Sequence, residues 1–568
     1  MSIQRTIPHS RQASSERLER NIVHSALWAA AGDALGWITE LSHGQSGVAR
    51  RAGVAFVTEP VFWQRVIGGR NGPKVELPAG TYSDDTQLRL AVSRSIRGNG
   101  SFDVETFAKI EITVWPTYSL GGGLGTKTAA LNLSRRGVNW FSNFFDSAGQ
   151  KYTSGGGNGA AMRIQPHVWA SADYSDEMLL NVLRDALVTH GHPHGFCGAV
   201  FHALALASTL ANDAIPSPDT WKEFAERFVD LPRLIAKEPQ LAAFWRSAWE
   251  NNAGTSLDTA LRSTRDAAIE DILLAAQIAE NLGPAGYHEV LDRLECLQPK
   301  FRGSGLKTAL AALVLAYIYR DGSIEQALAC AANELESDTD TIATMAGALL
   351  GSISGRPPEW PVQDRRYIEQ EAMRLAAVAL KRPQDSFTYP DLGRWNPPAK
   401  QIASIGWSEE GLAIAGLGRL TPQGAEYRVG DAIWQWCTLP FGQTILAKRK
   451  ANLKEHISDE QLPGPRQKAQ TDMRRVEKQE LVTSSQSKLP FEDRRSDHHR
   501  SSSTPQSRPL PRDAIDALSD EAIHSEFDDL TVGRLLNRCI DSSQSVDAAI
   551  GFAAIVAKAK LARQRRRR

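Results

Sequence analysis

The sequence predicts an all-α protein whose main part, residues 18–382, is an orthogonal bundle of helices. Two observations predict this class. Apolar residues recur with the 3.6-residue period of a helix through almost all of that range. No set of segments within it alternates apolar and polar residues as half-buried strands do. With 568 residues, the chain is also long enough to bury a large core.

The first part of the bundle is expected to contain three helices separated by loops. The first is predicted over residues 18–31, followed by a stretch in which Gly32 and Gly36 allow close backbone approach or a positive φ. Residues 50–80 are punctuated by glycine and proline and are predicted to be loop. A second helix starts at Asp84 and Asp85, and a third covers residues 103–115.

Helical periodicity continues through the second part of the bundle. Residues 176–211 are predicted to form two helices joined by a loop at residues 189–195. Further helices are expected over residues 218–229, 239–250, 264–282 and 306–319, and Ser323 with Gln326 predicts the N-terminus of another. The last helix, residues 342–351, is small or apolar on every face, which is typical of a helix buried in the core.

The composition changes after residue 382. Residues 383–456 contain Trp395, Trp407, Trp434 and Trp436 between turn residues, which predicts a small aromatic-rich appendage packed on the main domain. Residues 457–512 are polar, charged and rich in Ser and Pro, and a disordered linker is expected there. Residues 513–568 regain helical periodicity and end in a basic tail, interpreted as a solvated terminus or as a contact for nucleic acid or an acidic partner.

Charge and cysteine content narrow the class of protein. Lys plus Arg and Asp plus Glu each number 65, so no whole-chain charge points to nucleic acid. The five cysteines are scattered and form no Cys-x-x-Cys pair, which favours a reducing compartment over a zinc–thiolate site. Residues 1–20 lack an apolar signal core, and no uninterrupted apolar run of membrane-spanning length occurs. We therefore expect a cytoplasmic protein without a membrane partner.

Two acidic segments, residues 83–86 and 338–341, each stand at the start of an apolar helix. Capping of the helices is one explanation, because aspartate accepts backbone N–H groups there. If the segments meet, however, Asp84, Asp85, Asp338 and Asp340 place four negative charges in one site. Two divalent cations would neutralise them, and ligands made only of oxygen select Mg²⁺ or Mn²⁺, less readily Ca²⁺. Such a pair of ions suits hydrolysis.

Glycine and histidine motifs offer further candidate sites. Residues 121–128 partly match the motif of a phosphate-binding P-loop. The motif needs glycine directly before its lysine, but Thr126 precedes Lys127 here. The loop Gly155, Gly156, Gly157, Asn158 and Gly159 can present backbone N–H groups to an anion, although glycines also mark ordinary turns. His190, His192 and His194 alternate as zinc ligands can, but their Gly and Pro neighbours favour an interhelical loop.

Five short motifs occur in the order and with the separations of one known family. They are Gly-Asp-Ala-Leu-Gly at 32–36 with Glu40, Ser-Asp-Asp-Thr at 83–86, Gly-Asn-Gly-Ala-Ala-Met-Arg at 157–163, Thr-His at 189–190 and Asp-Thr-Asp-Thr-Ile-Ala at 338–343. Through them the chain resembles the ADP-ribosylglycohydrolase family, which includes the glycohydrolase that reactivates dinitrogenase reductase and the vertebrate ADP-ribosyl-acceptor hydrolases.

The resemblance implies an all-α fold that holds two Mg²⁺ or Mn²⁺ ions. It implies metal ligands on two sides of the ion pair: Ser83, Asp84 and Asp85 on one side and Asp338, Asp340 and Thr341 on the other. Asp84, Asp85, Asp338 and Glu40 would be catalytic, with Glu40 as a mobile gate. The loop of Gly155, Gly156, Gly157, Asn158 and Gly159 would receive the diphosphate of ADP-ribose, and His190 would lie beside the ribose.

The reaction implied by the resemblance is metal-assisted attack of water at the anomeric carbon, which releases ADP-ribose from an ADP-ribosylated protein, with arginine as the favoured acceptor. Two alternatives stay open. The chain could be an ADP-ribose-binding or immunity module that acts by occluding a partner. It could also hydrolyse a small conjugate such as O-acetyl-ADP-ribose, or ADP-ribosylated nucleic acid. The regions after residue 382 are candidates for recognising a modified target, as a protein or nucleic-acid contact.

Two departures from the family pattern stand close to the implied site. Glu336 and Ser337 occupy positions where many relatives have glycines, so Glu336 is expected to add bulk and charge near the metals. Ser83 stands where threonine is common, and it keeps the hydroxyl that a metal would need.

Overall fold

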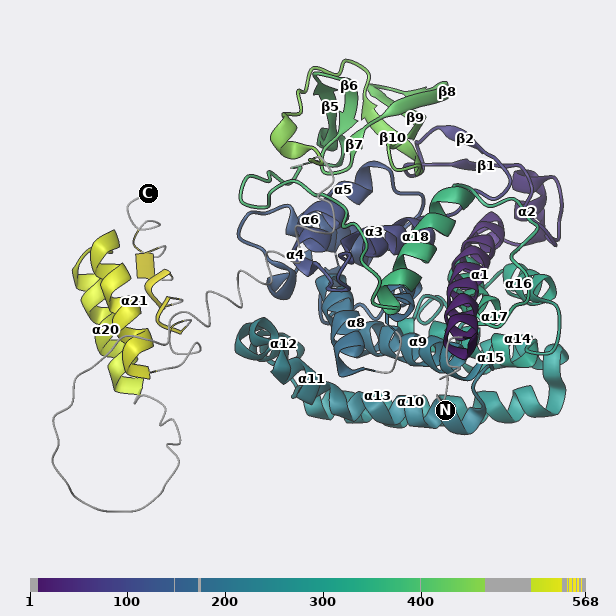
Figure 1. Cartoon of the computed structure of the whole chain (residues 1–568), viewed down its shortest axis with the longest axis horizontal. Coiled ribbons are helices and arrows are strands. Elements are labelled where there is room, and N and C mark those ends of the chain that lie inside the picture. The colour runs from purple at the N-terminus through teal and green to yellow at the C-terminus, as the bar shows by residue number, and fades with distance from the viewer. Residues whose placement is uncertain are drawn as a thin grey trace, which may run out of the picture. The chain divides into compact units, whose positions relative to one another are not determined.

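The computed structural model describes residues 9–147, 149–171, 175–398, 400–464 and 512–543, together with residues 549, 551–553, 555–557, 559, 560 and 563. The chain divides into two compact units, Met1–Glu477 and Lys478–Arg568. The first unit is mostly helical and carries all the described strands (Figure 1). The prediction of an all-α main domain is confirmed.

The helices of the first unit pack around one large apolar core. Their bounds are α1 His9–Thr39, α2 Gln45–Ala52, α3 Asp84–Ser95, α4 Val104–Thr106, α5 Ile112–Val114, α6 Leu124–Leu133, α7 Gln165–Trp169, α8 Asp176–Thr189, α9 Pro193–Asn212, α10 Pro218–Glu226, α11 Leu231–Lys237, α12 Arg246–Ala253, α13 Leu257–Leu282, α14 Tyr287–Arg293, α15 Gly305–Ile318, α16 Ile324–Asn333, α17 Thr339–Gly351 and α18 Arg365–Ala379. A π-helical segment, Phe107–Glu111, joins α4 to α5, so the helix predicted over residues 103–115 contains one widened turn.

Helices α1 and α17 run side by side and make the most extensive contact between two helices of the described chain (Figure 1). Glycines make this contact at four-residue intervals: Gly36 faces Thr339 and Asp340, Gly32 faces Ala343, Gly347 faces Trp28 and Gly351 faces His24. The residue numbers rise on one helix as they fall on the other, so the pair is antiparallel. A Cβ atom at Gly36 would lie 2.3 Å from the Thr339 carbonyl oxygen. Only glycine permits this approach.

Helix α1 extends to Thr39, so the predicted end at residue 31 is wrong. Gly32 and Gly36 lie inside the helix and serve the contact with α17. Each glycine costs a helix about 1 kcal/mol relative to alanine, but burial of the tightly packed helix pair outweighs that cost. The longer helix carries Asp33 within it and places Glu40 one residue beyond its end.

Helices α8 and α9 confirm the pair predicted over residues 176–211, with the loop between Thr189 and Pro193. Among the described residues, α9 is the helix long and apolar enough to cross a membrane. Within the protein, 83% of its most apolar stretch is buried, and it packs against α15. Its apolar composition is therefore that of a core helix.

Residues 50–80, predicted to be loop, contain a hairpin. Strand β1 (Trp63–Val66) pairs with the antiparallel strand β2 (Lys74–Leu77), and β2 alternates exposed and buried residues. The prediction failed because strands of four residues between glycines and prolines are too short for a clear alternating pattern. A second, smaller hairpin joins β3 (Asp146–Ser147) to β4 (Gln150–Lys151).

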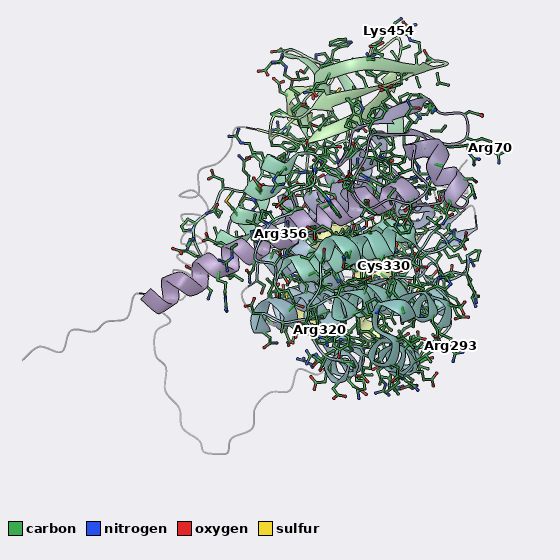
Figure 2. All side chains as sticks on the ribbon, turned by 90° about the vertical axis from the view of Figure 1, so that its right-hand side faces the viewer. Arg70, Arg293, Arg320, Cys330, Arg356 and Lys454 are labelled. Atoms are coloured by element: carbon green, nitrogen blue, oxygen red, sulfur yellow. The ribbon has the colours of Figure 1, made fainter. Side chains whose placement is uncertain are left out.

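The aromatic-rich appendage, residues 383–456, contains two three-stranded antiparallel sheets. Their strands are β5 Ile405–Ser408, β6 Gly411–Ile414, β7 Gly418–Arg419, β8 Thr421–Val429, β9 Ala432–Thr438 and β10 Thr444–Lys450, with spatial orders β5-β6-β7 and β10-β9-β8. Figure 2 shows these strands at one end of the first unit, with Lys454 at the outer surface and Arg70 at the surface near the β1–β2 hairpin.

The packed chain continues past the expected end of the appendage. Ile457 is buried, and its backbone N–H donates a hydrogen bond to the Trp407 carbonyl oxygen at 2.9 Å. The Gly416 N–H also donates to the Gln461 carbonyl oxygen at 2.8 Å. The predicted disordered linker therefore does not begin at residue 457. Residues 465–511, the rest of that predicted linker, lie outside the described residues.

A buried hydrogen-bond network joins the appendage to the helices. Arg94 of α3 forms an ion pair with Glu111 at 2.7 Å, and both side chains are almost completely buried. Arg94 also donates a hydrogen bond to the Gln443 side chain at 2.7 Å, and the Tyr389 hydroxyl donates one to Glu111 at 2.6 Å. The appendage thus supplies two of the partners that make this buried ion pair tolerable.

The second unit has its own small core. Helices α20 (Arg512–His524) and α21 (Asp529–Ser543) contact each other, and residues of the predicted helical segment gather in one apolar cluster: Leu518, Ala522, Phe527, Leu535, Cys539, Phe552 and Val556. The basic tail, residues 564–568, lies outside the described residues.

Candidate functional site

A cavity of about 1230 Å³ opens in the first unit, and most of the predicted site residues line it. These are Glu40, Asp84, Asp85, Gly155, Gly156, Gly157, Asn158, Gly159, His190, Asp338, Asp340 and Thr341. Both acidic segments therefore meet at one cavity, although more than 250 residues separate them in the chain. Ser83 is the predicted site residue that is not among the lining residues.

The first acidic segment is held by Asp33, which lies inside α1. Its buried carboxylate accepts hydrogen bonds from the Ser83 backbone N–H at 2.8 Å, the Thr86 N–H at 2.9 Å and the Thr86 hydroxyl at 2.6 Å. Ser83 is the N-cap of α3, because its hydroxyl accepts the Asp85 N–H at 3.3 Å. The predicted capping of α3 is thus performed by Ser83 and Asp33, which leaves the carboxylates of Asp84 and Asp85 directed at the cavity.

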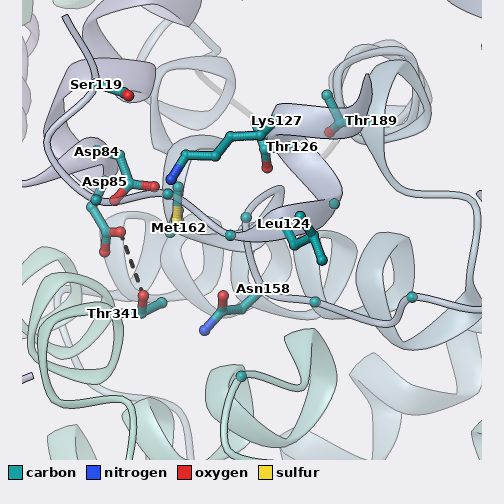
Figure 3. Close-up of a pocket in the computed structure, with 18 of the residues that line it drawn as sticks. Asp84, Asp85, Ser119, Leu124, Thr126, Lys127, Asn158, Met162, Thr189 and Thr341 are labelled. Atoms are coloured by element: carbon teal, nitrogen blue, oxygen red, sulfur yellow. Dashed lines mark hydrogen bonds between the residues drawn. The ribbon is translucent and has the colours of Figure 1, made fainter. Parts of the chain in front are cut away.

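In the second acidic segment, Asp340 accepts the Thr341 backbone N–H at 2.9 Å in the first turn of α17, but Asp338 is left free of any capping role. Asp338 is the N-cap residue of α17, but its side chain makes no capping hydrogen bond. Instead it accepts the side-chain N–H of Asn158 at 2.9 Å, which ties the Gly-rich loop to α17. The Thr341 hydroxyl donates to Asp85 at 3.4 Å, so the two acidic segments touch directly (Figure 3).

The shared charge of these segments is visible in the pKa values of the carboxyl groups. Burial, followed by the charges of Glu40 and Asp33, raises the pKa of Asp84 to about 8. Burial and neighbouring carboxylates also raise the pKa values of Asp85 and Asp340. The buried Oδ2 atom of Asp85 has no hydrogen-bond partner. An orphaned carboxylate oxygen among like charges is the expected state of a cluster that binds cations.

The Gly-rich loop is fixed by two neighbouring segments. The Asn158 N–H donates to the Gly303 carbonyl oxygen and the Gly305 N–H donates to the Gly156 carbonyl oxygen, both at 2.8 Å. Behind the loop, the buried Arg163 donates to the Gly159 carbonyl oxygen and to Asp185 of α8. The loop is thereby a preformed part of the cavity wall, and its backbone is available to a ligand only on the cavity side.

The three alternate histidines have separate hydrogen-bond partners. Nδ1 of His190 lies 2.7 Å from the Thr189 hydroxyl, and Nδ1 of His194 lies 2.9 Å from the Ser304 hydroxyl. His192 accepts the backbone N–H of His194. Burial lowers the pKa of His190 to about 3, so this residue is neutral beside the Gly-rich loop. The interpretation as an interhelical loop fits these contacts better than a zinc site does.

Glu40 has a partner that the sequence pattern did not reveal. Both terminal nitrogens of Arg65 on β1 lie 3.0 Å from Oε2 of Glu40, and the guanidinium carbon lies 5.4 Å from the centre of the Trp37 ring. Burial raises the pKa of Glu40, and the Arg65 charge acts against that rise. Arg65 is thus a positioning residue for the predicted gate. No periodicity or motif marks it, because the hairpin itself was not predicted.

Lys127 lies on α6 and does not belong to a phosphate-binding loop. Helix α6 begins at Leu124, and the Lys127 side chain extends toward Asp84 in the cavity (Figure 3). Its positive charge partly offsets the upward shift of the Asp84 pKa. A P-loop also needs a strand before its glycines, but the element that precedes Gly121 is the short 3₁₀ helix Trp115–Thr117. The rejection of the P-loop interpretation agrees with this local structure.

The expected intrusion of Glu336 into the site is wrong. The Glu336 side chain is 65% exposed, pairs with Arg302 at 3.1 Å and does not line the cavity. The turn before α17 leaves Glu336 exposed, whereas Asp338, two residues later, lines the cavity.

The chain is similar to a known family of enzymes over most of its length. A family model described as ADP-ribosylglycohydrolase matches residues 14–385, well over half of the chain. This match places the chain among enzymes that hydrolyse glycosidic bonds. The chain belongs to the ADP-ribosylglycohydrolase family.

Several relatives are similar at low identity. The ADP-ribosylhydrolase ARH3 of Homo sapiens is 28% identical over 51% of this chain and 77% of its own length. The ADP-ribosylarginine hydrolase Tri1 of Pseudomonas putida is 24% identical over 55% of this chain and 69% of its own. The ADP-ribosyl-[dinitrogen reductase] glycohydrolase of Rhodospirillum rubrum is 29% identical over 29% of this chain, and the match spans about half of that protein (49%).

A solved structure described as an ADP-ribosylglycohydrolase-related protein complex is similar over 64% of this chain and 99% of its own, with 22% identity and a TM-score of 0.40. The family match ends at residue 385, so most of the appendage and the whole second unit lie outside it.

Proposed function

We propose that the chain is a metal-dependent hydrolase that cleaves the bond between ADP-ribose and an arginine side chain of a protein, releasing ADP-ribose. The observation that carries this proposal is the meeting of two acidic helix starts at one cavity, opposite a fixed Gly-rich loop. The name of the Pseudomonas putida relative, an ADP-ribosylarginine hydrolase, supports arginine as the acceptor.

Charge and burial support a pair of divalent cations at the carboxylates. Asp84, Asp85, Asp338, Asp340 and Thr341 would hold Mg²⁺ or Mn²⁺, since oxygen ligands suit hard cations. In the part of the chain that the structure describes, no three His, Cys, Asp or Glu side chains have the spacing of a preformed metal site. Bound ions would neutralise the cluster, polarise the ribose hydroxyls and supply a nucleophilic water.

The protein's own groups would orient the substrate around that centre. The Gly-rich loop would receive the diphosphate through backbone N–H groups other than those of Gly155 and Asn158, which donate to the Lys151 and Gly303 carbonyl oxygens. Neutral His190 would stand beside the ribose. Asn158 would keep the loop in register with Asp338 through their 2.9 Å hydrogen bond. Glu40, anchored by Arg65, would close the acidic side of the cavity.

Release of ADP-ribose from defined conjugates tests the proposal. The purified protein with Mg²⁺ is expected to hydrolyse ADP-ribosyl-arginine in preference to ADP-ribosyl-serine, O-acetyl-ADP-ribose or ADP-ribosylated nucleic acid. Excess EDTA is expected to stop the reaction, and added Mg²⁺ or Mn²⁺ to restore it. No release from any conjugate, or full activity in EDTA, would contradict the proposal.

Loss of the Arg65 side chain is expected to weaken catalysis without removing a catalytic group. Arg65→Gln removes the charge-assisted hydrogen bonds to Glu40, so kcat/KM for ADP-ribosyl-arginine should fall about tenfold, equivalent to ~1.4 kcal/mol. Arg70→Gln, an exposed change near the same hairpin, is the matched control and should keep wild-type kcat/KM (Figure 2). Equal values for both variants would show that Arg65 does not position the gate.

A further inference from the structure

The appendage contributes part of the cavity wall. Trp434 on β9 and Leu446 and Lys448 on β10 line the cavity next to residues 65–69, which include the end of β1 and the turn after it. These three residues lie beyond residue 385, where the family match ends. The family match therefore assigns no role to them.

Trp434 and Lys448 belong to one row of side chains across the sheet, and Leu446 lies two residues before Lys448 on β10. In the antiparallel register Trp434 stands opposite Tyr427 on one neighbour and Lys448 on the other, so the three share one face. This face packs on the β1–β2 hairpin. A Cβ atom at Gly68 would lie 2.8 Å from the Trp434 ring, and the Glu76 N–H donates to the Tyr427 hydroxyl at 3.4 Å.

Contacts connect the carboxylate cluster both to the Gly-rich loop and to the hairpin under this wall. On one side, Asp338 is tied to Asn158 of the loop. On the other side, Glu40 interacts electrostatically with Asp338 and is held by Arg65, which belongs to the hairpin under the wall. If the diphosphate occupies the Gly-rich loop and the reacting carbon lies at the carboxylates, Trp434, Leu446 and Lys448 belong to the remaining cavity wall that can receive the acceptor.

Lys448 brings a positive charge to this wall. Its ammonium lies 4.8 Å from the centre of the Trp434 ring, and it is half-buried. Within the described chain no carboxylate lies within ion-pair distance of Lys448, whereas its neighbours Arg449 and Lys450 are paired with Glu426 and Glu455. Burial lowers the pKa of Lys448, as expected for a cation without an anionic partner. A cation in this position favours an anionic group on the acceptor.

We propose that Trp434, Leu446 and Lys448 form the acceptor-binding wall of the cavity, and that Lys448 selects protein acceptors carrying an Asp or Glu side chain next to the modified residue. This inference rests on the proposed hydrolysis of ADP-ribosylated protein. The carboxylate of the target would supply the partner that Lys448 lacks, and Trp434 would pack on the apolar part of the peptide.

Matched peptides test this selection. Two peptides carry one ADP-ribosyl-arginine flanked by Asp in one and by Asn in the other, and the readout is the ratio of their kcat/KM values. The wild-type protein is expected to favour the Asp peptide roughly three- to tenfold, the range of partly exposed to charge-assisted pairs. Lys448→Met should bring the ratio to about one, and Lys448→Glu should invert it.

Lys454→Met is the matched control, because Lys454 is exposed at the outer surface of the first unit and does not line the cavity (Figure 2). It should keep the wild-type ratio. A wild-type ratio near one, or a preference that survives Lys448→Met, would overturn the inference while leaving the proposed function intact.

Two further arms separate the remaining outcomes. Free ADP-ribosyl-arginine is included, and failure to hydrolyse it and both peptides would overturn the proposed function together with this inference. An ADP-ribosylated oligonucleotide with a terminal phosphate is the other arm. If it exceeds both peptides in kcat/KM and loses that advantage in Lys448→Met, the wall would belong to nucleic-acid acceptors and the protein-acceptor assignment would be wrong.

Discussion

Asp338→Asn is expected to reduce the release of ADP-ribose by at least about 10³-fold, equivalent to ~4 kcal/mol of transition-state stabilisation. The substitution keeps the size of the side chain but removes one negative charge from the cluster that would hold the cations. Asp338 is not needed as a cap, since its side chain makes no capping hydrogen bond in α17. The loss should therefore appear in kcat with a folded protein, as checked by circular dichroism and single-turnover kinetics.

Glu336→Gln is the matched control for this substitution. It removes the same charge two residues earlier, from a side chain that is exposed and paired with Arg302. Activity should stay within about twofold of wild type, as is usual for exposed ion pairs. A second readout does not depend on turnover: Mg²⁺ should raise the thermal midpoint of the wild-type protein and of Glu336→Gln, but much less that of Asp338→Asn. Equal Mg²⁺ responses in all three proteins would contradict metal binding at Asp338.

Gly36→Ala is expected to lower the free energy of unfolding by about 3 kcal/mol, the upper part of the range for overpacked cores. The new Cβ atom would lie 2.3 Å from the Thr339 carbonyl oxygen and 2.5 Å from the Asp340 Cα atom. These are backbone atoms, so no side chain can rotate to relieve the contact, and α1 must move away from the start of α17. Denaturant unfolding monitored by tryptophan fluorescence measures the loss.

The same change should also weaken the proposed metal-dependent activity, because Asp340 lies at the point where the helices would separate. Gly355→Ala is the matched control, since no atom lies within 4 Å of a Cβ built there and its φ is not positive. It should leave stability within about 0.5 kcal/mol of wild type. A Gly36→Ala protein as stable as Gly355→Ala would mean that the helix pair has more room than the structure indicates.

Helical periodicity was sufficient to predict the fold class, but local signals misplaced some boundaries. The end of α1 is the clearest case. Gly32 and Gly36 lower the stability of an isolated helix. In the folded protein they allow the close packing of α1 on α17, which the local sequence does not reveal. The strands of the hairpin and appendage were missed because they are short, and because their partners are set by long-range pairing that no local window contains.

The sequence motifs predicted which residues line the candidate site, but not the contacts that hold those residues in place. The acidic residues, the Gly-rich loop and His190 were all expected, and the structure places them around one cavity. What the motifs did not reveal is how these residues are held. Asp33 fixes the start of α3 and Arg65 anchors Glu40. Asp33 and Arg65 both act through contacts with residues that are distant in the chain. The spacing of residues along the sequence therefore cannot predict these two roles.

The buried ion pair of Arg94 and Glu111 has a consequence for the integrity of the helical domain. Gln443 and Tyr389 complete its hydrogen bonding, and both lie beyond residue 385, where the family match ends. Without them, two buried charges would have fewer hydrogen-bond partners, which is costly. The segment after residue 385 is therefore a structural part of the helical domain in this chain, and its removal is expected to lower the free energy of unfolding of that domain.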